Sequence, residues 1–482
     1  MHYIDKYIQQ VIQLGDEGSK LLNAITAPTL RNSEYVDVLE GGMNGLAVLR
    51  VPKNMNVVVH SASGDPNLSD LKTHTISLVD RLFLQSENIE GIPIGFANVI
   101  DSNSGDQDVL KLIGNTLTMM ANEYGLAILN GENAILGNRV NGLANVSGTM
   151  ISLVPKSLSA EGIFGNGIDN YSIFDPKGMA IWINSDGVGT KTEFYERTGN
   201  FGGALSDSLA MKLDDAIKKG ATAKTVFDIL ETKGDIPSKE IIQQALALGK
   251  MMGFDYLIKH EDVGARLMGY NAESPVMNLS GSVVSVIDEE RLRNPLKPKE
   301  GDYLIAISGK SNPRSNGITQ KREIMVEAFG NNYHESDMGK HYLEYLAQPS
   351  IVFYPLFKKL IESGWANSVY HMSGGSFNGK LARPLAQEGF YVSAEGLFEP
   401  DEREIWIMRR TGTSVEAAYT KWPMGNDGFI TTSNPEKVQD LLNQQFPDLK
   451  CRVVGRVKQV AGKSGIEFKS FTGNKIYFSG KE

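Results

Sequence analysis

Cysteine is almost missing from this 482-residue chain, which has only Cys451. A single cysteine excludes an intrachain disulfide and any zinc or iron–sulfur site built from several cysteines. Long apolar runs are missing too, since no stretch approaches the ~20 residues that cross a membrane. The first residues carry Asp5 and several glutamines, unlike a signal peptide. We therefore expect a cytoplasmic protein without a membrane partner.

An excess of positive charge is also missing. The chain has 57 acidic and 48 basic side chains, a net charge of −9, which argues against a nucleic-acid partner. The composition, 41% hydrophobic and 22% charged, is ordinary for a soluble globular protein. The length corresponds to about three domains of roughly 150 residues each. Disorder is therefore not expected, and several cores can form.

Standard nucleotide and hydrolase motifs are missing as well. Two Gly-Lys-Ser triplets, at 309–311 and 462–464, lack the upstream glycine of a P-loop. Gly165-Asn166-Gly167 lacks the third glycine of a dinucleotide fingerprint. No histidine pair has zinc-ligand spacing, and no Gly-x-Ser-x-Gly elbow occurs.

Glycine, in contrast, occurs at 50 positions, often in short clusters after apolar runs, such as Gly187–Gly189 and Gly374–Gly379. Glycine at a strand-to-helix junction allows a positive φ and a close approach of the backbone to a ligand. Strand patterns recur with helical segments between them. The sequence therefore predicts an α/β or α+β fold.

The chain also contains an internal repeat of about 125 residues. Three pairs of segments match in order, at offsets of 124, 129 and 133: Val57–Ser61 with Ile181–Ser185, Ile128–Asn133 with Leu257–Asp262, and Asn145–Thr149 with Asn278–Ser282. Loop insertions would make the offset grow in this way. We predict a first copy at 1–156, a second copy at 157–297 and a different C-terminal domain at 298–482, with Arg293–Lys299 as the linker.

The second copy carries a candidate phosphate loop. The apolar strand Ala180–Ile183 runs into Asp186-Gly187-Val188-Gly189-Thr190-Lys191. Backbone N–H groups and Lys191 can approach phosphate oxygens, and Asp186 can hold a metal ion. A plain turn is the alternative interpretation.

A helix predicted around 207–216 carries further carboxylates. Leu209, Leu213 and Ala216 make one apolar face. Asp207 and Asp214 lie on the opposite side, with Asp215 at its edge. The pattern alone favours a solvated helix face, and metal coordination is the sharper alternative.

The first copy lacks these features and keeps others. It has Gln85-Ser86 where the second copy has Asp214-Asp215, and it has no counterpart of Lys191. It retains a predicted turn, Gly131-Glu132-Asn133-Ala134, where the second copy reads His260-Glu261-Asp262-Val263. The two copies therefore divide the features of the site between them.

Several segments together resemble one enzyme family. The motif at 186–191 resembles the Asp-Gly-Val-Gly-Thr-Lys signature of aminoimidazole ribonucleotide (AIR) synthetase, also called phosphoribosylformylglycinamidine cyclo-ligase. Further resemblances follow in that family's order: Leu213–Ala221, Gly301–Ile305, Arg314–Gly317, His371–Gly375, Pro423–Gly425 and Val454–Val457. They cover about residues 160–460, and the first ~155 residues match only as a degenerate extra copy.

The resemblance implies an α/β fold of α+β sandwich type, with tandem PurM-like N-terminal domains as an internal pseudo-dimer and one PurM-like C-terminal domain. It implies ATP and Mg²⁺ as cofactors and a small-molecule nucleotide substrate, whose amide oxygen is phosphorylated before ring closure. The implied ATP-binding residues are Gly131, Glu132, Asn133, Asp186, Gly187, Gly189, Thr190 and Lys191. Asp186 and Asp215 would hold the metal, and Lys191, His371 and Arg314 would act in catalysis.

Departures from the family pattern leave other readings open. Arg314 stands where the family has histidine, and Asp214 where it has asparagine. Because arginine favours a carboxylate or phosphate partner, another ATP-dependent PurM-like enzyme with a different substrate is one alternative. A nucleotide-binding pseudoenzyme or scaffold is another. We also expect a composite site from both copies, in a monomer or a homo-oligomer.

Overall fold

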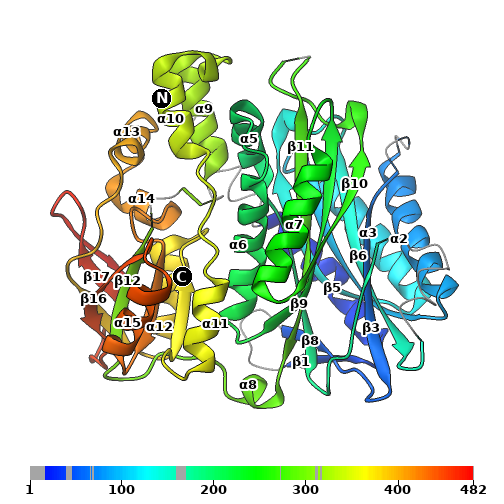
Figure 1. The fold of residues 1–482 in the computed structure, drawn as a ribbon, viewed down its shortest axis with the longest axis horizontal. Coiled ribbons are helices and arrows are strands. Elements are labelled where there is room, and N and C mark those ends of the chain that lie inside the picture. Colours follow the sequence, from blue (N-terminus) through cyan, green and yellow to red (C-terminus); the bar gives the residue numbers. More distant parts are fainter. Residues whose placement is uncertain are drawn as a thin grey trace. The chain divides into compact units, whose positions relative to one another are not determined.

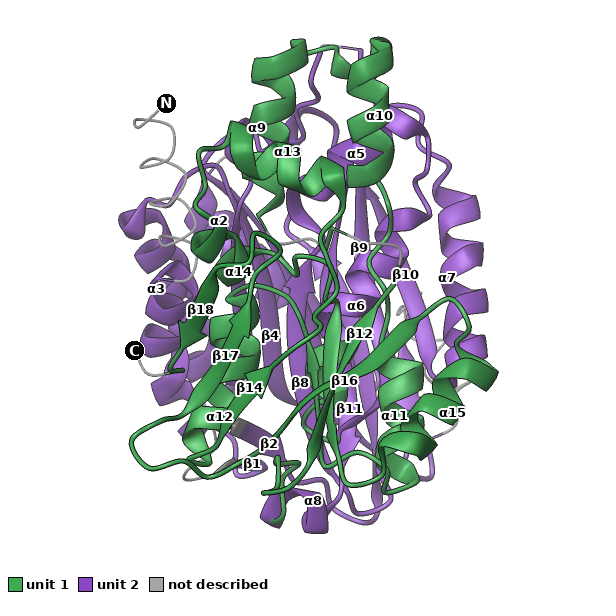
Figure 2. Ribbon diagram, turned by 90° about the vertical axis from the view of Figure 1, so that its left-hand side faces the viewer, with its two compact units in different colours: residues 1–8, 213–220, 294–482 green, residues 9–212, 221–293 purple. Residues whose placement is uncertain are grey.

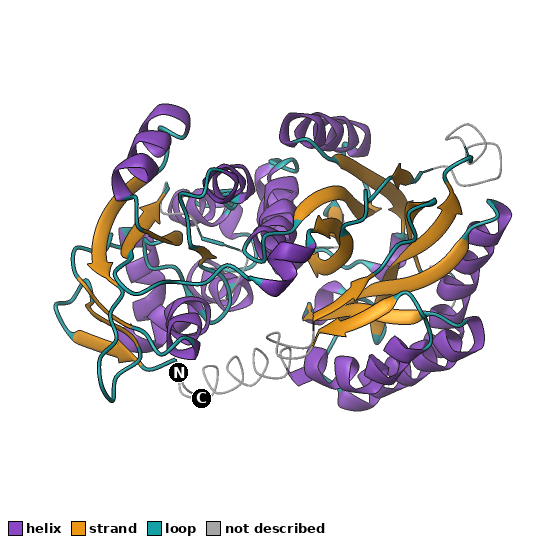
Figure 3. Ribbon diagram, turned by 90° about the horizontal axis from the view of Figure 1, so that it is seen from below, coloured by secondary structure: helices purple, strands orange, loops and turns teal. Residues whose placement is uncertain are grey.

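The computed structural model describes residues 17–39, 46–65, 67, 70–158, 170–271, 273–309, 313–314 and 317–480 (Figure 1). The chain forms two compact units (Figure 2). Unit 1 comprises residues 1–8, 213–220 and 294–482, and unit 2 comprises residues 9–212 and 221–293. The three predicted domain boundaries, at 156, 297 and 482, stay a prediction. Helices and strands are mixed along the described chain (Figure 3).

The first sheet of unit 2 has five strands in the order β5-β4-β6-β3-β7; four come from the first copy, and β7 comes from the part of the chain predicted as the second copy. Its strands and helices are β3 (Met55–Ser63), α2 (Leu71–Asn88), β4 (Ile92–Ser102), α3 (Gln107–Tyr124), β5 (Ala127–Ile135), η2 (Gly137–Arg139), β6 (Ala144–Pro155) and β7 (Ser172–Phe174). Asp70 caps α2 by accepting a hydrogen bond from the backbone N–H of Thr73, and α3 ends at Gly125 with φ +68°. Leu78, Phe96 and Leu110 are fully buried in the core between helices and sheet.

The second sheet of unit 2 has six strands in the order β1-β2-β8-β11-β9-β10. β1 (Val36–Leu39) and β2 (Leu46–Leu49) join it from the part of the chain predicted as the first copy, and η1 (Ala27–Arg31), which precedes them, contacts β5 and α3. The second copy supplies β8 (Ala180–Gly187), η3 (Gly189–Lys191), α5 (Thr192–Thr198), α6 (Gly203–Ile217), β9 (Thr222–Lys233), α7 (Ser238–Met252), β10 (Asp255–Asp262), η4 (Gly264–Arg266), β11 (Val276–Ile287) and α8 (Glu289–Arg293). The last residues of α6, from Leu213, belong to unit 1.

The two sheets repeat one strand order. β5-β4-β6-β3 in the first sheet corresponds to β10-β9-β11-β8 in the second. β4 and β5 are parallel, as are β9 and β10, and the other equivalent pairs are antiparallel. The registers agree as well, since Asn98 pairs with Gly148 and Asp228 pairs with Gly281. The predicted fold class, with its duplicated domain, is confirmed.

The copies pack against each other inside unit 2. One apolar core contains Val57 and Ile151 from the first copy with Ile181, Phe227 and Val284 from the second. Two equivalent backbone hydrogen bonds also cross between the copies. The N–H of Asn141 donates to the Arg266 carbonyl at 2.7 Å, and the N–H of Met268 donates to the Arg139 carbonyl at 3.0 Å. This reciprocity is what a pseudo-dimer requires.

Unit 1 contains a four-stranded sheet of order β13-β15-β12-β16 and a three-stranded sheet of order β14-β17-β18. Its strands are β12 (Tyr303–Ser308), β13 (Ser368–His371), β14 (Tyr391–Ala394), β15 (Gly428–Thr432), β16 (Lys450–Arg456), β17 (Gly465–Lys469) and β18 (Lys475–Phe478). Its helices are α9 (Ile318–Phe329), η5 (Tyr333–Glu335), α10 (Asp337–Leu346), α11 (Tyr354–Glu362), the π-helix η6 (Phe377–Ala382), α12 (Arg383–Gln387), α13 (Glu402–Arg410), α14 (Val415–Lys421) and α15 (Pro435–Gln445). Among the described residues, no helix is both long and apolar enough to cross a membrane.

Candidate functional site

The predicted phosphate loop follows the buried strand β8. Gly187 is the last residue of that strand, and Gly189–Lys191 forms the short helical turn η3 that leads into α5. Gly189 has φ +67°, which suits glycine and disfavours other residues. The N–H of Val188 donates to the Leu279 carbonyl at 2.9 Å, which ties the loop to β11. The loop is therefore held at both ends by regular structure.

The first copy contributes residues beside this loop. The Asn130 side chain accepts a hydrogen bond from the N–H of Ser185 at 3.0 Å. A Cβ atom at Gly189 would lie 3.7 Å from the Leu136 side chain. Unit 2 therefore brings the segment around Gly131–Asn133 to the same region as the loop.

The interpretation of Gly131–Ala134 as a turn is wrong. These residues lie inside strand β5, where Gly131 to Ala134 pair with Asn98 to Asp101 of β4. Pairing with a neighbouring strand overrides the local turn preference of glycine and asparagine. Ser19 donates to the Glu132 carboxylate at 3.3 Å and accepts from the N–H of Asn133 at 3.1 Å.

Lys191 is fully buried in an ion pair. Its ammonium group lies 3.0 Å from the Asp207 carboxylate, and neither side chain is exposed. The Tyr195 hydroxyl also donates to Asp207, and burial together with that carboxylate raises the pKa of Tyr195 well above its ordinary value. In this arrangement Lys191 fixes the start of α5 to α6.

A second buried ion pair lies nearby on α6. Lys212 donates to the Asp228 carboxylate on β9, and both side chains are fully buried. Ser208 and Tyr256 donate to the other oxygen of Asp228, at 2.5 and 2.8 Å. Helix α6 therefore has charged groups inside the protein.

The expectation of a solvated face on this helix is wrong. Asp207 and Asp214 are both 0% exposed. The polar side of α6 is buried because each carboxylate has a basic partner, Lys191 for Asp207 and Arg314 for Asp214. A buried charge needs such a partner, which a helical pattern alone does not reveal.

Asp186 has carboxylate neighbours in unit 2. Burial, Glu231 and Asp186 together raise the pKa of Asp101 to about 7. Asn278 donates to Asp101 at 2.7 Å and to Glu231 at 3.0 Å. The second oxygen of Asp101 is buried without a hydrogen-bond partner among the described residues. A carboxylate in these surroundings suits a cation or a retained proton.

Unit 1 contains a group of polar and charged residues that includes the predicted site residues Asp215 and His371. We call Asp215, Lys218, His371 and Lys380 the Asp215 cluster. Lys218 donates to Oδ1 of Asp215, and the Lys380 ammonium and His371 Nε2 lie 3.9 and 3.7 Å from the same oxygen. Although burial opposes the effect, the ammonium groups of Lys218 and Lys380 hold the pKa of Asp215 well below its ordinary value.

His371 is neutral in this cluster. Burial lowers its pKa well below the ordinary value, an effect that Asp215 opposes and Lys380 and Lys218 reinforce. Its Nε2 is hydrogen-bonded with the Ser373 hydroxyl at 3.0 Å. Its Nδ1 is buried without a hydrogen-bond partner among the residues that the structure describes.

Arg314 binds Asp214 directly. Its guanidinium donates to Oδ2 of Asp214 at 3.0 Å and to the Ile351 carbonyl at 3.2 Å, and Arg314 is only 3% exposed. Burial raises the pKa of Asp214 to about 7, an effect that Arg314 opposes. The two departures from the family pattern are therefore partners in one buried contact.

The residues at Asp215 do not fit a magnesium ion. A divalent cation bound there would face two ammonium groups, and Mg²⁺ prefers oxygen ligands. In the described part of the chain, no group of three or more His, Cys, Asp or Glu side chains is placed to hold a metal. Asp186, whose charge contributes to the raised pKa of Asp101, has a carboxylate near it and suits a cation better.

Sequence reasoning missed two basic residues with specific contacts. Arg139 of the first copy donates to Glu196 at 2.6 Å and to Thr192 at 3.0 Å in the second copy. The sequence contained a signal for Arg139, because Gly-x-Arg occurs at equivalent places of the two copies, at 137–139 and at 264–266. Lys380 follows the Gly374–Gly379 cluster, but no spacing rule linked it to Asp215.

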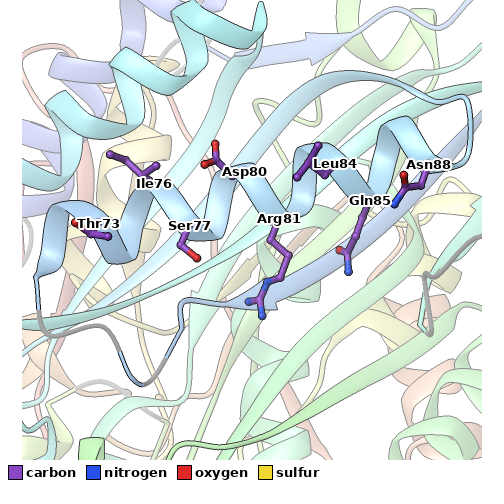
Figure 4. Close-up of a pocket in the computed structure, with 8 residues that line it drawn as sticks. All are labelled: Thr73, Ile76, Ser77, Asp80, Arg81, Leu84, Gln85 and Asn88. Carbon is purple, nitrogen blue, oxygen red and sulfur yellow. The ribbon is translucent and has the colours of Figure 1, made fainter.

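A shallow groove runs along the outer side of α2 (Figure 4). Figure 4 shows its lining side chains projecting from that helix: Thr73, Ile76, Ser77, Asp80, Arg81, Leu84, Gln85 and Asn88. Of these, Asp80 accepts a hydrogen bond from Tyr124 at 2.6 Å. No predicted site residue lines the groove.

Three curated relatives of this chain share one name. The chain is 27% identical to phosphoribosylformylglycinamidine cyclo-ligase of Pyrococcus horikoshii over 58% of its own length and 80% of that enzyme. It is 26% identical to the enzyme of Thermococcus kodakarensis and 23% identical to that of Thermoplasma acidophilum, over 60% of its own length and 81% and 83% of theirs. No protein-family model matches.

Solved structures give weaker likenesses. The hydrogenase maturation protein HypE of E. coli is 12% identical, with a TM-score of 0.39 over 63% of this chain and 86% of that one. Thiamine monophosphate kinase of Aquifex aeolicus is 14% identical, with a TM-score of 0.36 over 62% and 90%. Over most of the length of its curated relatives, this chain resembles the phosphoribosylformylglycinamidine cyclo-ligases, that is, the AIR synthetases.

Proposed function

We propose that the protein is an ATP-dependent cyclo-ligase that converts formylglycinamidine ribonucleotide to aminoimidazole ribonucleotide. The similarity to cyclo-ligases over 80% or more of their length carries this proposal. The reaction activates an amide oxygen by phosphorylation, because that oxygen is otherwise a poor leaving group. An internal nitrogen then attacks the same carbon, the ring closes and phosphate leaves.

In this proposal the loop of unit 2 binds the nucleotide. Gly189 and Thr190 bring the backbone to the phosphate oxygens, and the N–H of Gly187 orients Asp186 by donating to its Oδ1 at 2.8 Å. Lys191 fixes the loop through its buried pair with Asp207, which supports a positioning role for its charge. When bound, Mg²⁺ would neutralise charge on the ATP phosphates, and Asp186 is the residue suited to hold it.

For unit 1 taken by itself, we propose that the Asp215 cluster contacts the substrate. His371 is neutral and has an unpartnered nitrogen, which suits a group that accepts or donates one proton near the reacting amide. Arg314 acts through Asp214 and is a positioning residue. These roles support a site in which several buried groups are oriented before the substrate binds.

The test is direct. Purified protein is incubated with formylglycinamidine ribonucleotide, ATP and Mg²⁺, and phosphate release and product formation are followed together. Formation of aminoimidazole ribonucleotide at a rate that Lys191→Ala abolishes supports the proposal. The matched control is Lys111→Ala, which removes an exposed lysine on α3.

A second candidate is another ATP-dependent enzyme of PurM-like type with a different substrate. The buried pair of Arg314 and Asp214 favours it, since both residues differ from the family pattern. ATP binding without aminoimidazole ribonucleotide would support this candidate. Absence of ATP binding would leave a scaffold without turnover.

The oligomeric state tests the pseudo-dimer separately. We propose that the first copy takes the place of a second subunit, because equivalent contacts join the two copies inside unit 2. Size-exclusion chromatography with light scattering should then give a monomer. A dimer that forms through the second copy would contradict this part of the proposal.

A further inference from the structure

Arg139 of the first copy is buried among groups of the second copy. It is the last residue of η2 and is only 4% exposed. Its guanidinium donates to both carboxylate oxygens of Glu196, at 2.6 and 3.1 Å, and to the Met277 carbonyl at 3.2 Å. Glu196 in turn accepts from the N–H of Met277 at 2.9 Å. One planar guanidinium therefore joins the first copy to both α5 and β11 of the second.

Another hydrogen bond of Arg139 leads to the predicted phosphate loop. The guanidinium donates to the Thr192 hydroxyl at 3.0 Å, and this hydroxyl donates to the Gly189 carbonyl at 3.0 Å. Thr192 is 1% exposed. Gly189 is the residue of the loop with φ +67°, so its conformation determines the path of the loop backbone. Two hydrogen bonds in series thus connect the first copy to that backbone.

Arg139 also belongs to a network of four buried charged side chains. Glu193 Oε2 lies 3.6 Å from Arg139, and Arg197 donates to Oε1 of Glu193 at 2.6 Å. Burial raises the pKa of Glu196, an effect that Arg139 opposes. Desolvation offsets much of the attraction in such a network. Its distinct contribution is geometric, because the rigid fork of Arg139 fixes the direction of each hydrogen bond.

The first copy has an equivalent of the loop in its backbone geometry. The N–H of Gly64 donates to the Val146 carbonyl at 2.9 Å, as the N–H of Val188 donates to the Leu279 carbonyl at 2.9 Å. Gly64 and Val188 are 124 positions apart (188 − 64), the same offset as the strands that precede them. The two segments therefore leave their sheets in the same way, and the next residue of each can be compared.

The arginine equivalent to Arg139 reaches the equivalent residue. Arg266 ends η4 as Arg139 ends η2, and it donates to the backbone carbonyl of Asp65. At the offset of 124, Asp65 corresponds to Gly189. Each copy therefore sends an arginine to the same backbone carbonyl of the other copy, directly in one direction and through Thr192 in the other. This repetition indicates a contact that belongs to the construction of the loop.

We propose that Arg139 is a positioning residue of the nucleotide loop, supplied by the first copy in place of a second subunit. This proposal rests on the proposed function, which assigns nucleotide binding to the loop. Arg139 acts through Thr192 and does not itself touch the nucleotide. It holds the Gly189 carbonyl, so that the loop keeps one backbone path before the nucleotide binds. The first copy has no counterpart of Lys191, so the nucleotide binds at the second copy.

The first experiment measures binding of the ATP analogue AMPPCP with Mg²⁺ by calorimetry. Arg139→Lys keeps the positive charge, but one ammonium group cannot reproduce the guanidinium fork between Glu196 and Thr192. The affinity for the analogue should fall about tenfold. The matched control is Arg266→Lys, the same substitution at the equivalent place, which should leave the affinity unchanged. Equal affinities of the wild type and Arg139→Lys, or equal losses in the two variants, would overturn the proposal.

A second pair of variants tests the hydroxyl between Arg139 and the loop. Thr192→Val removes this hydroxyl and keeps the branched shape of the side chain, and the ion pair with Glu196 stays. The affinity for AMPPCP should fall several-fold, whereas Thr192→Ser, which keeps the hydroxyl, should bind like the wild type. These variants also serve if Arg139→Lys fails to fold. Unchanged affinity in Thr192→Val, or an equal loss in Thr192→Ser, would contradict the role of the hydroxyl and with it the proposal.

Failure of the positioning role and failure of the proposed reaction give different results. Weaker AMPPCP binding in Arg139→Lys, in a protein without cyclo-ligase turnover, would retain the positioning role and contradict the reaction. Turnover whose KM for ATP is unchanged in Arg139→Lys would retain the reaction and overturn the positioning role. Under both proposals together, Arg139→Lys should raise the KM for ATP about tenfold and leave the KM for the ribonucleotide unchanged. Wild-type protein that does not bind AMPPCP would contradict both.

Discussion

The two copies in unit 2 differ most at one helix. Helix α2 of the first copy and α6 of the second end at Asn88 and Ile217, so their residues correspond at an offset of 129 (217 − 88). Leu78 and Val79 then correspond to Asp207 and Ser208. All four side chains are at least 98% buried. The same position in the same fold is apolar in one copy and charged in the other.

The contrast indicates where the function lies. A buried ion pair is often no more stable than a well-packed apolar pair of similar volume, because desolvation offsets the attraction. The first copy shows that this fold accepts the apolar solution. The charged residues of the second copy are therefore not needed to hold the helix, and they lie beside the predicted nucleotide loop.

The surface between the copies does not share this asymmetry. Asn145 donates to Glu231 at 2.6 Å, and the equivalent Asn278 donates to Asp101 at 2.7 Å. Each bond joins an asparagine of one copy to a carboxylate of the other. The contacts that hold the pseudo-dimer together thus keep their symmetry, and the differences are concentrated at the helix.

The largest expected effect comes from breaking the Lys191–Asp207 pair. Lys191→Met leaves Asp207 buried without the counter-charge of the ammonium group, which should cost about 3–5 kcal/mol of unfolding free energy. The double variant Lys191→Met/Asp207→Leu imitates the first copy and should recover most of that loss. Chemical denaturation measures both.

In the double variant Lys191→Met/Asp207→Leu, turnover should not recover together with the unfolding free energy. If the charges serve the nucleotide loop, the folded double variant should remain inactive by orders of magnitude. A double variant with the turnover of the wild type would show that the charged core has no functional role. Lys111→Met, at an exposed site on α3, is the matched control for the loss of one lysine.

The next effect concerns Arg314 and Asp214. Asp214→Asn alone leaves the buried guanidinium without its counter-charge, and Arg314→His alone leaves the buried carboxylate. Each should destabilise the protein by about 3 kcal/mol. The double variant restores the family's histidine and asparagine, and it should be at least about 2 kcal/mol more stable than the sum of the two single changes implies.

The same two single variants and the double variant form a double-mutant cycle that also tests the identity of the substrate. If Arg314 and Asp214 only position the site, the double variant should keep measurable cyclo-ligase activity. An additive double-mutant cycle would contradict the coupling that the 3.0 Å contact implies. Loss of activity with recovered stability would favour the candidate with a different substrate.

The sequence allowed the duplicated fold to be predicted because strand patterns are local. The matches at Val57–Ser61 and Ile181–Ser185 fall on β3 and β8, which hold equivalent places in the two sheets. The predicted turn at Gly131–Ala134 failed because partner strand β4, about 30 residues away in sequence, decides its conformation.

The candidate site was only partly predictable for a related reason. Asp215, Arg314 and His371 were chosen as site residues through the family resemblance, and their roles stay a prediction; the structure places His371 Nε2 3.7 Å from Asp215 and Arg314 against Asp214. The ion pairs of this region were not predicted, because Arg314, the partner of Asp214, lies 100 residues away in sequence. A helical pattern shows which side chains are polar, but not whether a basic group will cover them.

A smaller effect should appear in the pH dependence of stability, through the buried Asp101 between the copies. The pKa of Asp101 is raised from 3.8 to about 7, so the folded state keeps a proton that the unfolded state releases. Stability should therefore fall as the pH rises from about 4 to about 7. Asp101→Asn removes this pH dependence. The unfolding free energy of the variant should therefore rise relative to that of the wild type, by on the order of 2 kcal/mol, between about pH 4 and pH 7. Thermal unfolding at pH 5 and pH 8 measures it, and Asp108→Asn, at an 89% exposed site, should show no such change.

The smallest effect should come from the first copy's counterpart of Asp214. At the offset of 129 this residue is Gln85, which lines the groove along α2 (Figure 4). Because that helix carries no buried ion pair, Gln85→Ala should change the unfolding free energy by about 0.5 kcal/mol or less. Turnover should change by less than twofold, whereas Asp214→Ala should lose most of it. A strong loss of turnover in Gln85→Ala would mean that the two copies share the chemistry more evenly than their buried charges indicate.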